Sequence, residues 1–421
     1  MPQPAARRTT AKQAPIRQGP RPLPYHLLLA ITTWLGLPSA SPLLRNASAS
    51  SNPALAASLE ALAGALASQP PDALAGTIDS EARRRLARLL DGIEAYRRHP
   101  YRRGLAGPPA LWQQGTTRLL DYRAAGAAGK DRRPALLVVP SLINRAYILD
   151  LTPETSLLRF LAGQGFRCFL VDWDRPGEAE RGFTLTDYVA GRLEAALEAV
   201  RAATAAPIVV LGYCMGGLLA LALAQRRARD LAGIAFLATP WDFHAERPEQ
   251  ARLVGATTAL LEPVLAPLGE LPVDLIQLLF AGLDPFQVIR KFLDFAELEA
   301  SSDRAALFVA LEDWLNVGVP LAAPVARDCL AGWYGRNSPG RGQWRIAGEP
   351  VRPSECPLPS LVVIPDRDRI VPPASALALA EALPRAEVLR PAAGHIGMVV
   401  GAGSASRLRQ PLAAWLLRQR A

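Results

Sequence analysis

A chain of 421 residues, half of them hydrophobic and a fifth charged, is long enough to bury a large core and an accessory lobe. Its formal net charge of +9 is concentrated at the start, because the first fifty residues carry six Lys and Arg residues and no acidic residue. Aromatic side chains do not alternate with these charges, so we expect no nucleic-acid partner. The four cysteines, at positions 168, 214, 329 and 356, have no paired spacing, which argues against a disulfide scaffold and a metal site and favours a cytoplasmic protein.

The N-terminal quarter of the chain predicts a tail followed by helices. Residues 1–24 are rich in Pro, Arg, Gln and Ala without an apolar period, which indicates a disordered basic tail. The apolar run 25–37 is too short for a membrane span, and it predicts a helix that packs on the protein or lies on a hydrophobic surface. A signal peptide is the alternative. Helical spacing of Ala and Leu over 53–96 extends this to an N-terminal helical region, 25–105.

Short continuous apolar runs from Pro134 onward predict strands that are buried on both faces. They are ALLVV (135–139), CFLVDW (168–173), PIVVLG (207–212), GIAFLA (233–238), LVVIP (361–365) and AEVLRP (386–391). Helical stretches at 154–164 and 186–202 separate the early runs, which indicates βαβ succession and a mainly parallel sheet. We therefore expect an α/β core in two parts, 106–240 and 356–421, separated by a cap insertion over 241–355.

A candidate nucleophile lies where the third of these strands meets a helix. The strand runs directly into GYCMGGLLALALAQ, so Cys214 occupies the sharp turn of a nucleophile elbow. Small residues are needed there, because a strained turn between adjacent strands has no room for Cβ atoms. The amide of Met215 and the positive end of the helix face this turn, where they favour a thiolate and stabilise an oxyanion. The alternative is a small buried hydrophobe in a glycine-rich bend.

The base is expected to be His395, one of only four histidines. It follows the last strand, where the chain order of nucleophile, acid and histidine in an α/β-hydrolase fold places the imidazole. His26, His99 and His244 lie in the N-terminal apolar run, in a basic turn and after a strand-like run, respectively.

The acid and the oxyanion donors are expected on two other loops at the same edge of the sheet. The loop after the penultimate strand carries Asp366 and Asp368, and either could orient an imidazole. The loop after the first strand, PSLINRAY, would supply the amide of Ile143 as a second oxyanion donor beside Met215.

From about Thr116 to the C-terminus the chain resembles the polyhydroxyalkanoate synthase family, cysteine-dependent α/β-hydrolase-fold enzymes that polymerise 3-hydroxyacyl-CoA. The blocks that carry the resemblance are VPSLINRAYILDLTPETSLLRFLAGQGFRCFLVDWDRPG, FTLTDYV, LGYCMGG, LATPWDFH, DWLNVGVPLAAPVARD, PDRDRIVPP and GHIGMVVG. The resemblance implies that Cys214 accepts the acyl group, that Asp368 is the acid and that His395 is the base. It also implies that 241–355 is a cap over the active site. Arg369 departs from the pattern, since the family commonly has His directly after the acid.

The resemblance implies an acyltransferase that joins 3-hydroxyacyl groups through a cysteine-bound intermediate and releases coenzyme A. Its substrate would be a coenzyme A thioester, its product a polyester, and it would need no cofactor. A cytoplasmic homodimer associated with polyester granules is expected on the same ground. A thioesterase or intracellular polyester depolymerase could use the same three residues, and this hydrolase remains the alternative. A non-catalytic granule protein is a further alternative, against which the intact Cys, Asp and His set argues.

Overall fold

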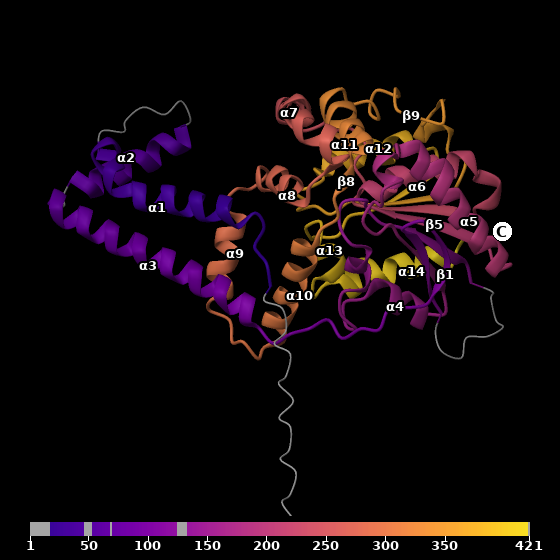
Figure 1. Cartoon of the computed structure of the whole chain (residues 1–421), viewed down its shortest axis with the longest axis horizontal. Coiled ribbons are helices and arrows are strands. Elements are labelled where there is room, and N and C mark those ends of the chain that lie inside the picture. The colour runs from indigo at the N-terminus through magenta and orange to yellow at the C-terminus, as the bar shows by residue number, and fades with distance from the viewer. Residues whose placement is uncertain (1–16, 46–52, 68–69, 124–132, 420–421) are drawn as a thin grey trace, which may run out of the picture. The chain divides into compact units, whose positions relative to one another are not determined.

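The computed structural model describes residues 17–45, 53–67, 70–123 and 133–419, and the chain divides into two compact units (Figure 1). The first unit combines the chain up to Tyr101 with Phe286–Asn316. The second comprises Arg102–Pro285 and Val317–Ala421. The cap expected as one insertion over 241–355 is therefore split, because its middle part belongs to the same unit as the N-terminal helices.

Most of the basic tail expected over 1–24 lies outside the described residues, which begin at Arg17. The Arg17 guanidinium is almost completely buried, and its Nε donates to Asp313 Oδ1 at 2.7 Å. This ion pair fixes the last part of the expected tail within the first unit.

The first unit is a bundle of helices that share one apolar core. Its helices are α1 (Leu23–Arg45), α2 (Pro53–Ala67), α3 (Pro71–Arg98), α9 (Gln287–Phe295) and α10 (Asp303–Val317). Aromatic rings make up much of the core, with Phe295 stacked on Phe308 at 4.3 Å and Phe292 edge-on to Tyr96 at 5.7 Å. The helices α3 and α9 approach closely at Gly92, where a Cβ would lie 2.2 Å from the carbonyl oxygen of Phe292.

The apolar run 25–37 lies within α1 and packs on the protein by one face. His26, Ala30 and Trp34, spaced by four residues, are buried in the first unit. Leu28 and Ile31 lie on another face and are 62% and 41% exposed. The run thus forms the predicted helix, docked on one side and apolar on the other.

An eight-stranded sheet forms the centre of the second unit, with the order β1-β2-β4-β3-β5-β6-β11-β12. The strands are β1 (Ala110–Gln114), β2 (Thr117–Tyr122), β3 (Ala135–Val139), β4 (Arg167–Asp172), β5 (Ile208–Tyr213), β6 (Gly233–Leu237), β11 (Ser360–Val363) and β12 (Ala386–Leu389). All neighbours from β4 to β12 are parallel, whereas β2 pairs antiparallel with β1 and with β4. The mainly parallel α/β sheet expected from the apolar runs is confirmed.

Helices cover both faces of this sheet, which is why β3, β5, β6 and β11 are buried at every residue. On one face α4 (Leu157–Gly163) contacts η7 (Ala405–Arg409), which leads into α14 (Gln410–Leu416). On the other face α6 (Met215–Arg226) contacts η3 (Asp187–Leu193), which leads into α5 (Glu194–Ala203). Figure 1 shows α4 and α14 below the sheet and α6 above it. The carboxyl ends of the parallel strands therefore form one edge at which loops can meet.

Further elements of the second unit come mostly from the expected cap. They are α7 (Pro248–Leu268), β7 (Glu270–Leu271), α8 (Val273–Ala281), β8 (Leu321–Ala322), α11 (Ala323–Arg327), η5 (Asp328–Gly335), β9 (Arg345–Ile346), β10 (Glu349–Pro350), η6 (Pro353–Glu355) and α12 (Pro373–Ala382). Among the described helices α7 alone has the length and hydropathy of a membrane span, and 17% of its most apolar window is buried. It packs on η5, while Leu253 and Leu260 are 69% and 79% exposed.

Replacing Gly92 by Ala should destabilise the first unit, because the new methyl group would collide with the α9 backbone. We expect a loss of about 1–3 kcal/mol in the free energy of unfolding, measured by urea denaturation with circular dichroism. Gly76→Ala in the same helix is the matched control, since a Cβ there meets nothing within 4 Å. The control should be neutral or stabilising by up to about 1 kcal/mol. Equal effects of both substitutions would contradict the close approach.

Candidate functional site

The backbone at Cys214 makes the sharp turn that the elbow motif predicts. Cys214 has φ 54° and ψ −127° and lies between the last residue of β5 and the first residue of α6. A positive φ is strained for a residue with a side chain, and it is held here by hydrogen bonds from Cys214 N to Leu237 O (2.8 Å) and from Gly217 N to Cys214 O (2.9 Å).

Two glycines make this turn possible by letting backbones touch. A Cβ on Gly212 would lie 2.4 Å from Gly217 Cα, and a Cβ on Gly216 would lie 2.1 Å from Val139 O. Both distances are shorter than van der Waals contact, and both obstacles are backbone atoms that cannot rotate away. The small residues beside Cys214 are therefore required by the packing of β5, α6 and the end of β3.

Cys214 is the one cysteine of the four that is not buried. Burial raises the pKa of the Cys168, Cys329 and Cys356 thiols, so these three stay protonated and unreactive near neutral pH. Accessibility and backbone geometry thus single out the same thiol that the sequence motif does.

His395 and Asp368 form a buried hydrogen-bonded pair. His395 Nδ1 donates to Asp368 Oδ2 at 2.7 Å, and both side chains are almost completely buried. The other carboxylate oxygen, Asp368 Oδ1, accepts from the amides of Ile370 (2.8 Å) and Val371 (2.9 Å). Because the backbone holds the carboxylate, the carboxylate in turn fixes the ring orientation of His395 and leaves Nε2 for a second partner.

That second partner is Cys214, as the electrostatics of the imidazole indicate. Burial by itself lowers the pKa of His395, but negative charge on Cys214 and hydrogen bonds with Asp368 and Cys214 outweigh it and raise the pKa to about 10. The imidazole is therefore set to hold a proton between a sulfur and a carboxylate. The structure brings together Cys214, His395 and Asp368, the three residues expected to form a catalytic set.

The structure also separates the alternatives that the sequence left open. Asp366 is an exposed residue whose carboxylate pairs with Arg390 Nε at 2.9 Å, so only Asp368 meets the imidazole. Arg369, which departs from the family pattern, pairs with Asp284 at 3.0 Å. His244 Nε2 bonds to Tyr334 O at 2.7 Å. His26 and His99 belong to the first unit.

The two expected oxyanion donors, the backbone amides of Met215 and Ile143, are placed differently. Met215 is the first residue of α6, so its amide is at the helix N-terminus beside Cys214. The Ile143 amide donates instead to Ser141 Oγ at 3.1 Å, and Ile143 O accepts from Val319 N at 3.0 Å. Ile143 would thus serve an oxyanion only after the Ser141 hydroxyl turns away. Its role and that of Met215 remain predictions.

Two tyrosines that sequence reasoning missed also line the thiol. The Tyr213 ring lies 5.3 Å from the His395 ring. Because Tyr213 directly precedes Cys214 in the elbow motif, its place in the sequence could have marked it as a site residue. Tyr334 comes from η5 in the expected cap, and no local pattern marks it. Burial and the neighbouring charge of Cys214 raise the pKa of both phenols, which therefore stay protonated.

Within the described part of the chain no group of three or more His, Cys, Asp and Glu side chains is arranged to hold a metal ion. The arrangement of Cys214, His395 and Asp368 fits nucleophilic attack by a thiolate with an imidazole as proton carrier.

Comparisons with known proteins show the fold family of the chain and its relatives. Residues 134–402 match the model of the family described as alpha/beta hydrolase fold. The poly(3-hydroxyalkanoate) polymerase subunits PhaC of Haloferax mediterranei and of Synechocystis are 28% and 27% identical over 72% and 78% of this chain. That of Allochromatium vinosum is 25% identical over 74%. These matches span 62%, 88% and 89% of the respective relatives. The resemblance to polyhydroxyalkanoate synthases is confirmed.

The stability of the fold should depend on pH through His395. Because its folded pKa of about 10 exceeds the unfolded value of about 6.5, protonated His395 contributes stability that is complete below about pH 6.5. That contribution is lost as the pH rises through about 10. Asp368→Asn removes part of the cause, so we expect it to cost about 2–4 kcal/mol at pH 6 and less at pH 10, in urea titrations.

Asp366→Asn is the control for this prediction, because its exposed pair with Arg390 should contribute less than about 1 kcal/mol at either pH. NMR of ring-labelled histidine should show a lowered pKa of His395 in Asp368→Asn alone. The electrostatic account fails if Asp368→Asn costs the same stability at both pH values.

Proposed function

Because this chain belongs to the alpha/beta hydrolase fold family, we propose that it is an acyltransferase that polymerises 3-hydroxyacyl groups from coenzyme A thioesters into a polyester. The observation that carries the proposal is a thiol, in place of the usual serine, on the strained elbow beside the His395–Asp368 pair. The relatives named as poly(3-hydroxyalkanoate) polymerases support the same substrate class.

In the first half-reaction His395 holds the proton that Cys214 has given up, because its pKa is raised, and the Cys214 thiolate attacks the thioester carbonyl carbon. The carbonyl oxygen gains the negative charge, which the amide of Met215, and that of Ile143 once it is free, would stabilise. The tetrahedral intermediate collapses with cleavage of the bond between carbon and the coenzyme A sulfur. The leaving thiolate takes the proton from His395, so coenzyme A departs as a thiol and the acyl group remains on Cys214.

In the second half-reaction the hydroxyl of another 3-hydroxyacyl unit or chain end attacks the acyl-cysteine. His395 accepts the hydroxyl proton, a new ester bond forms, and the bond between the acyl carbon and the Cys214 sulfur breaks. The Cys214 thiolate beside protonated His395 is thereby restored. Asp368 stabilises the imidazolium in both halves without itself becoming protonated.

A thiol suits two successive transfers because exchange between two thioesters is nearly isoenergetic. An acyl-cysteine therefore keeps enough reactivity to pass its acyl group to a hydroxyl, whereas a serine ester would hold it more tightly. Chemistry thus favours cysteine where the acceptor is an alcohol and the product is an ester.

Aromatic side chains around the thiol favour transfer over hydrolysis. Phe243 packs on Tyr334 at 5.0 Å and on Trp333 at 5.7 Å, and Trp333 packs on Trp344 at 5.5 Å. Tyr334, at the end of this row, neighbours Cys214. A water-poor surface of this kind protects the acyl-cysteine from hydrolysis, which competes with chain growth.

The setting of the reaction is part of the same proposal. We expect a cytoplasmic homodimer that meets its product at a granule surface and uses no cofactor besides the coenzyme A thioester substrate. The chain matches 62% of the length of the Haloferax relative. Deleting residues 1–50 and measuring granule binding would test the exposed apolar face of α1.

The alternative is a thioesterase or polyester depolymerase that transfers the same acyl group to water. Purified protein with 3-hydroxybutyryl-CoA distinguishes them, since a synthase releases coenzyme A and forms insoluble polymer, while a hydrolase releases the free acid. Butyryl-CoA adds a second test, because it has no 3-hydroxyl to continue the chain. A synthase should accumulate butyryl-Cys214, detected by mass spectrometry, and a hydrolase should not.

Cys214→Ala should lower kcat for coenzyme A release by at least about 10³-fold, because the acyl acceptor is lost while binding surfaces remain. Cys356→Ala is the matched control, since this buried thiol lies outside the site and its replacement should change kcat by less than about threefold. The cysteine mechanism would be ruled out by a Cys214→Ala variant that retains polymer formation.

A further inference from the structure

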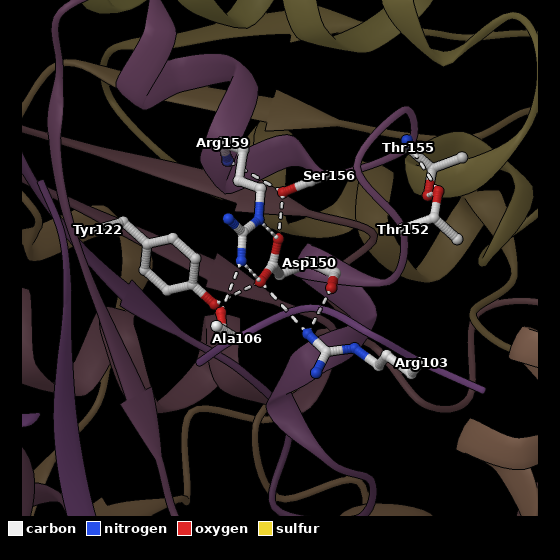
Figure 2. Close-up of polar contacts among 8 residues, drawn as sticks. All are labelled: Arg103, Ala106, Tyr122, Asp150, Thr152, Thr155, Ser156 and Arg159. Atoms are coloured by element: carbon white, nitrogen blue, oxygen red, sulfur yellow. Dashed lines mark hydrogen bonds and ion pairs between the residues drawn. The ribbon is translucent and has the colours of Figure 1, made fainter. Parts of the chain in front are cut away.

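A buried carboxylate away from the thiol joins several elements of the second unit. Asp150 is completely buried, and Oδ1 accepts from Ser156 Oγ (2.6 Å) and Arg159 Nε (2.7 Å). Its Oδ2 accepts from Tyr122 Oη (3.1 Å), Arg159 Nη2 (3.1 Å) and Arg103 Nη2 (3.3 Å). Figure 2 shows these side chains converging on the carboxylate, with Arg103 on one side and Arg159 on the other.

The Asp150 carboxylate accepts every one of these hydrogen bonds. A hydrogen bond to Asp150 raises the pKa of Arg159, and burial together with the Asp150 charge raises the pKa of Tyr122. Both side chains therefore remain protonated donors over the whole physiological range. Five hydrogen bonds to a dry carboxylate leave it no freedom to rotate.

The hydrogen bonds fix segments from distant parts of the chain to one point. Tyr122 ends β2, and Ser156 caps α4 by accepting from the amide of Arg159 at 3.0 Å. Arg103 also donates to the Asp150 backbone oxygen at 2.8 Å, and Arg159 donates to Ala106 O at 3.1 Å. The carboxylate thus joins the start of the second unit to the sheet and to a helix.

Asp150 is the last residue of η1 (Ala146–Asp150), and η1 adjoins the catalytic loops in two ways. Along the chain, it directly follows the loop that carries Ile143. In space, it contacts α13 (Gly397–Val400), which begins two residues after His395. A shift of η1 would therefore move both an expected oxyanion donor and the support of the imidazole.

We propose that Asp150 is a positioning residue for acyl transfer, which holds η1 so that the Ile143 loop and His395 keep their places relative to Cys214. The proposal rests on the acyl-transfer function proposed above. Displacement of a reacting group by about 1 Å costs on the order of 10²-fold in rate, so a remote anchor can control kcat without touching substrate.

Asp150→Asn is the test, because it keeps the shape of the side chain and removes its charge and one acceptor. We expect kcat for coenzyme A release from 3-hydroxybutyryl-CoA to fall by about 10–100-fold, with KM changed less than about threefold. Iodoacetamide alkylation of Cys214, the one cysteine that is not buried, should move to higher pH as the imidazole loses its alignment.

Asp121→Asn is the matched control on the neighbouring residue of β2. Asp121 forms a part-buried pair with Arg167 on β4 at 2.8 Å, and this pair does not involve η1. Its replacement should lower the melting temperature while leaving kcat and the alkylation profile within about twofold of the native values. Should Asp150→Asn fail to fold, Tyr122→Phe removes one hydrogen bond to Oδ2 and should still lower kcat, by about tenfold or less.

A purely structural role for Asp150 would show as a lowered melting temperature with unchanged kcat and an unchanged alkylation profile in Asp150→Asn, or in Tyr122→Phe, and this would overturn the proposal. Failure of the acyl-transfer function would look different. The native chain would then form no polymer from 3-hydroxybutyryl-CoA, whereas alkylation of Cys214 would still report whether Asp150 positions the thiol and the imidazole.

Discussion

The strained backbone at Cys214 is the constraint on which the rest of the site depends. Cys214 keeps its positive φ because the start of α6, the end of β3 and the carbonyl oxygen of Leu237 in β6 hold the turn in place. This packing requires glycine at 212 and 216, because backbone atoms of neighbouring segments lie too close to leave room for a Cβ. The parallel sheet thus serves the chemistry by bringing loops from β3, β5, β11 and β12 to one edge.

Two opposing effects set the state of the imidazole beside this turn. Burial disfavours a charged ring, yet the neighbouring sulfur and carboxylate favour it more strongly, so His395 retains a proton that it can give and take. The backbone amides of Ile370 and Val371 hold Asp368, and through it the ring. Asp150 and Asp368 share one feature, since each is a buried carboxylate that fixes neighbouring segments by accepting several hydrogen bonds.

The division of the chain into units revises the domain picture. Residues 286–316 are remote in sequence from the N-terminal helices, but their aromatic side chains complete the core of that unit. An apolar stretch between two parts of a core looks the same in sequence whether it covers the site or packs elsewhere. Where such a stretch lies in the fold depends on the segment against which its apolar face packs. For residues 286–316 that segment is the N-terminal helices, about two hundred residues away in the chain.

The sequence by itself determined the buried parallel strands, the elbow and the residue types of the site, because continuous apolar runs and glycine spacing are local consequences of burial and tight turns. It missed β1 and β2, whose mixed burial hides the strand pattern. Tertiary structure pairs Asp368 rather than Asp366 with His395, engages the Ile143 amide with Ser141, and brings Tyr334 near Cys214. The contacts of Asp368 with His395 and of Tyr334 with Cys214 join residues far apart in the chain, which no local pattern records.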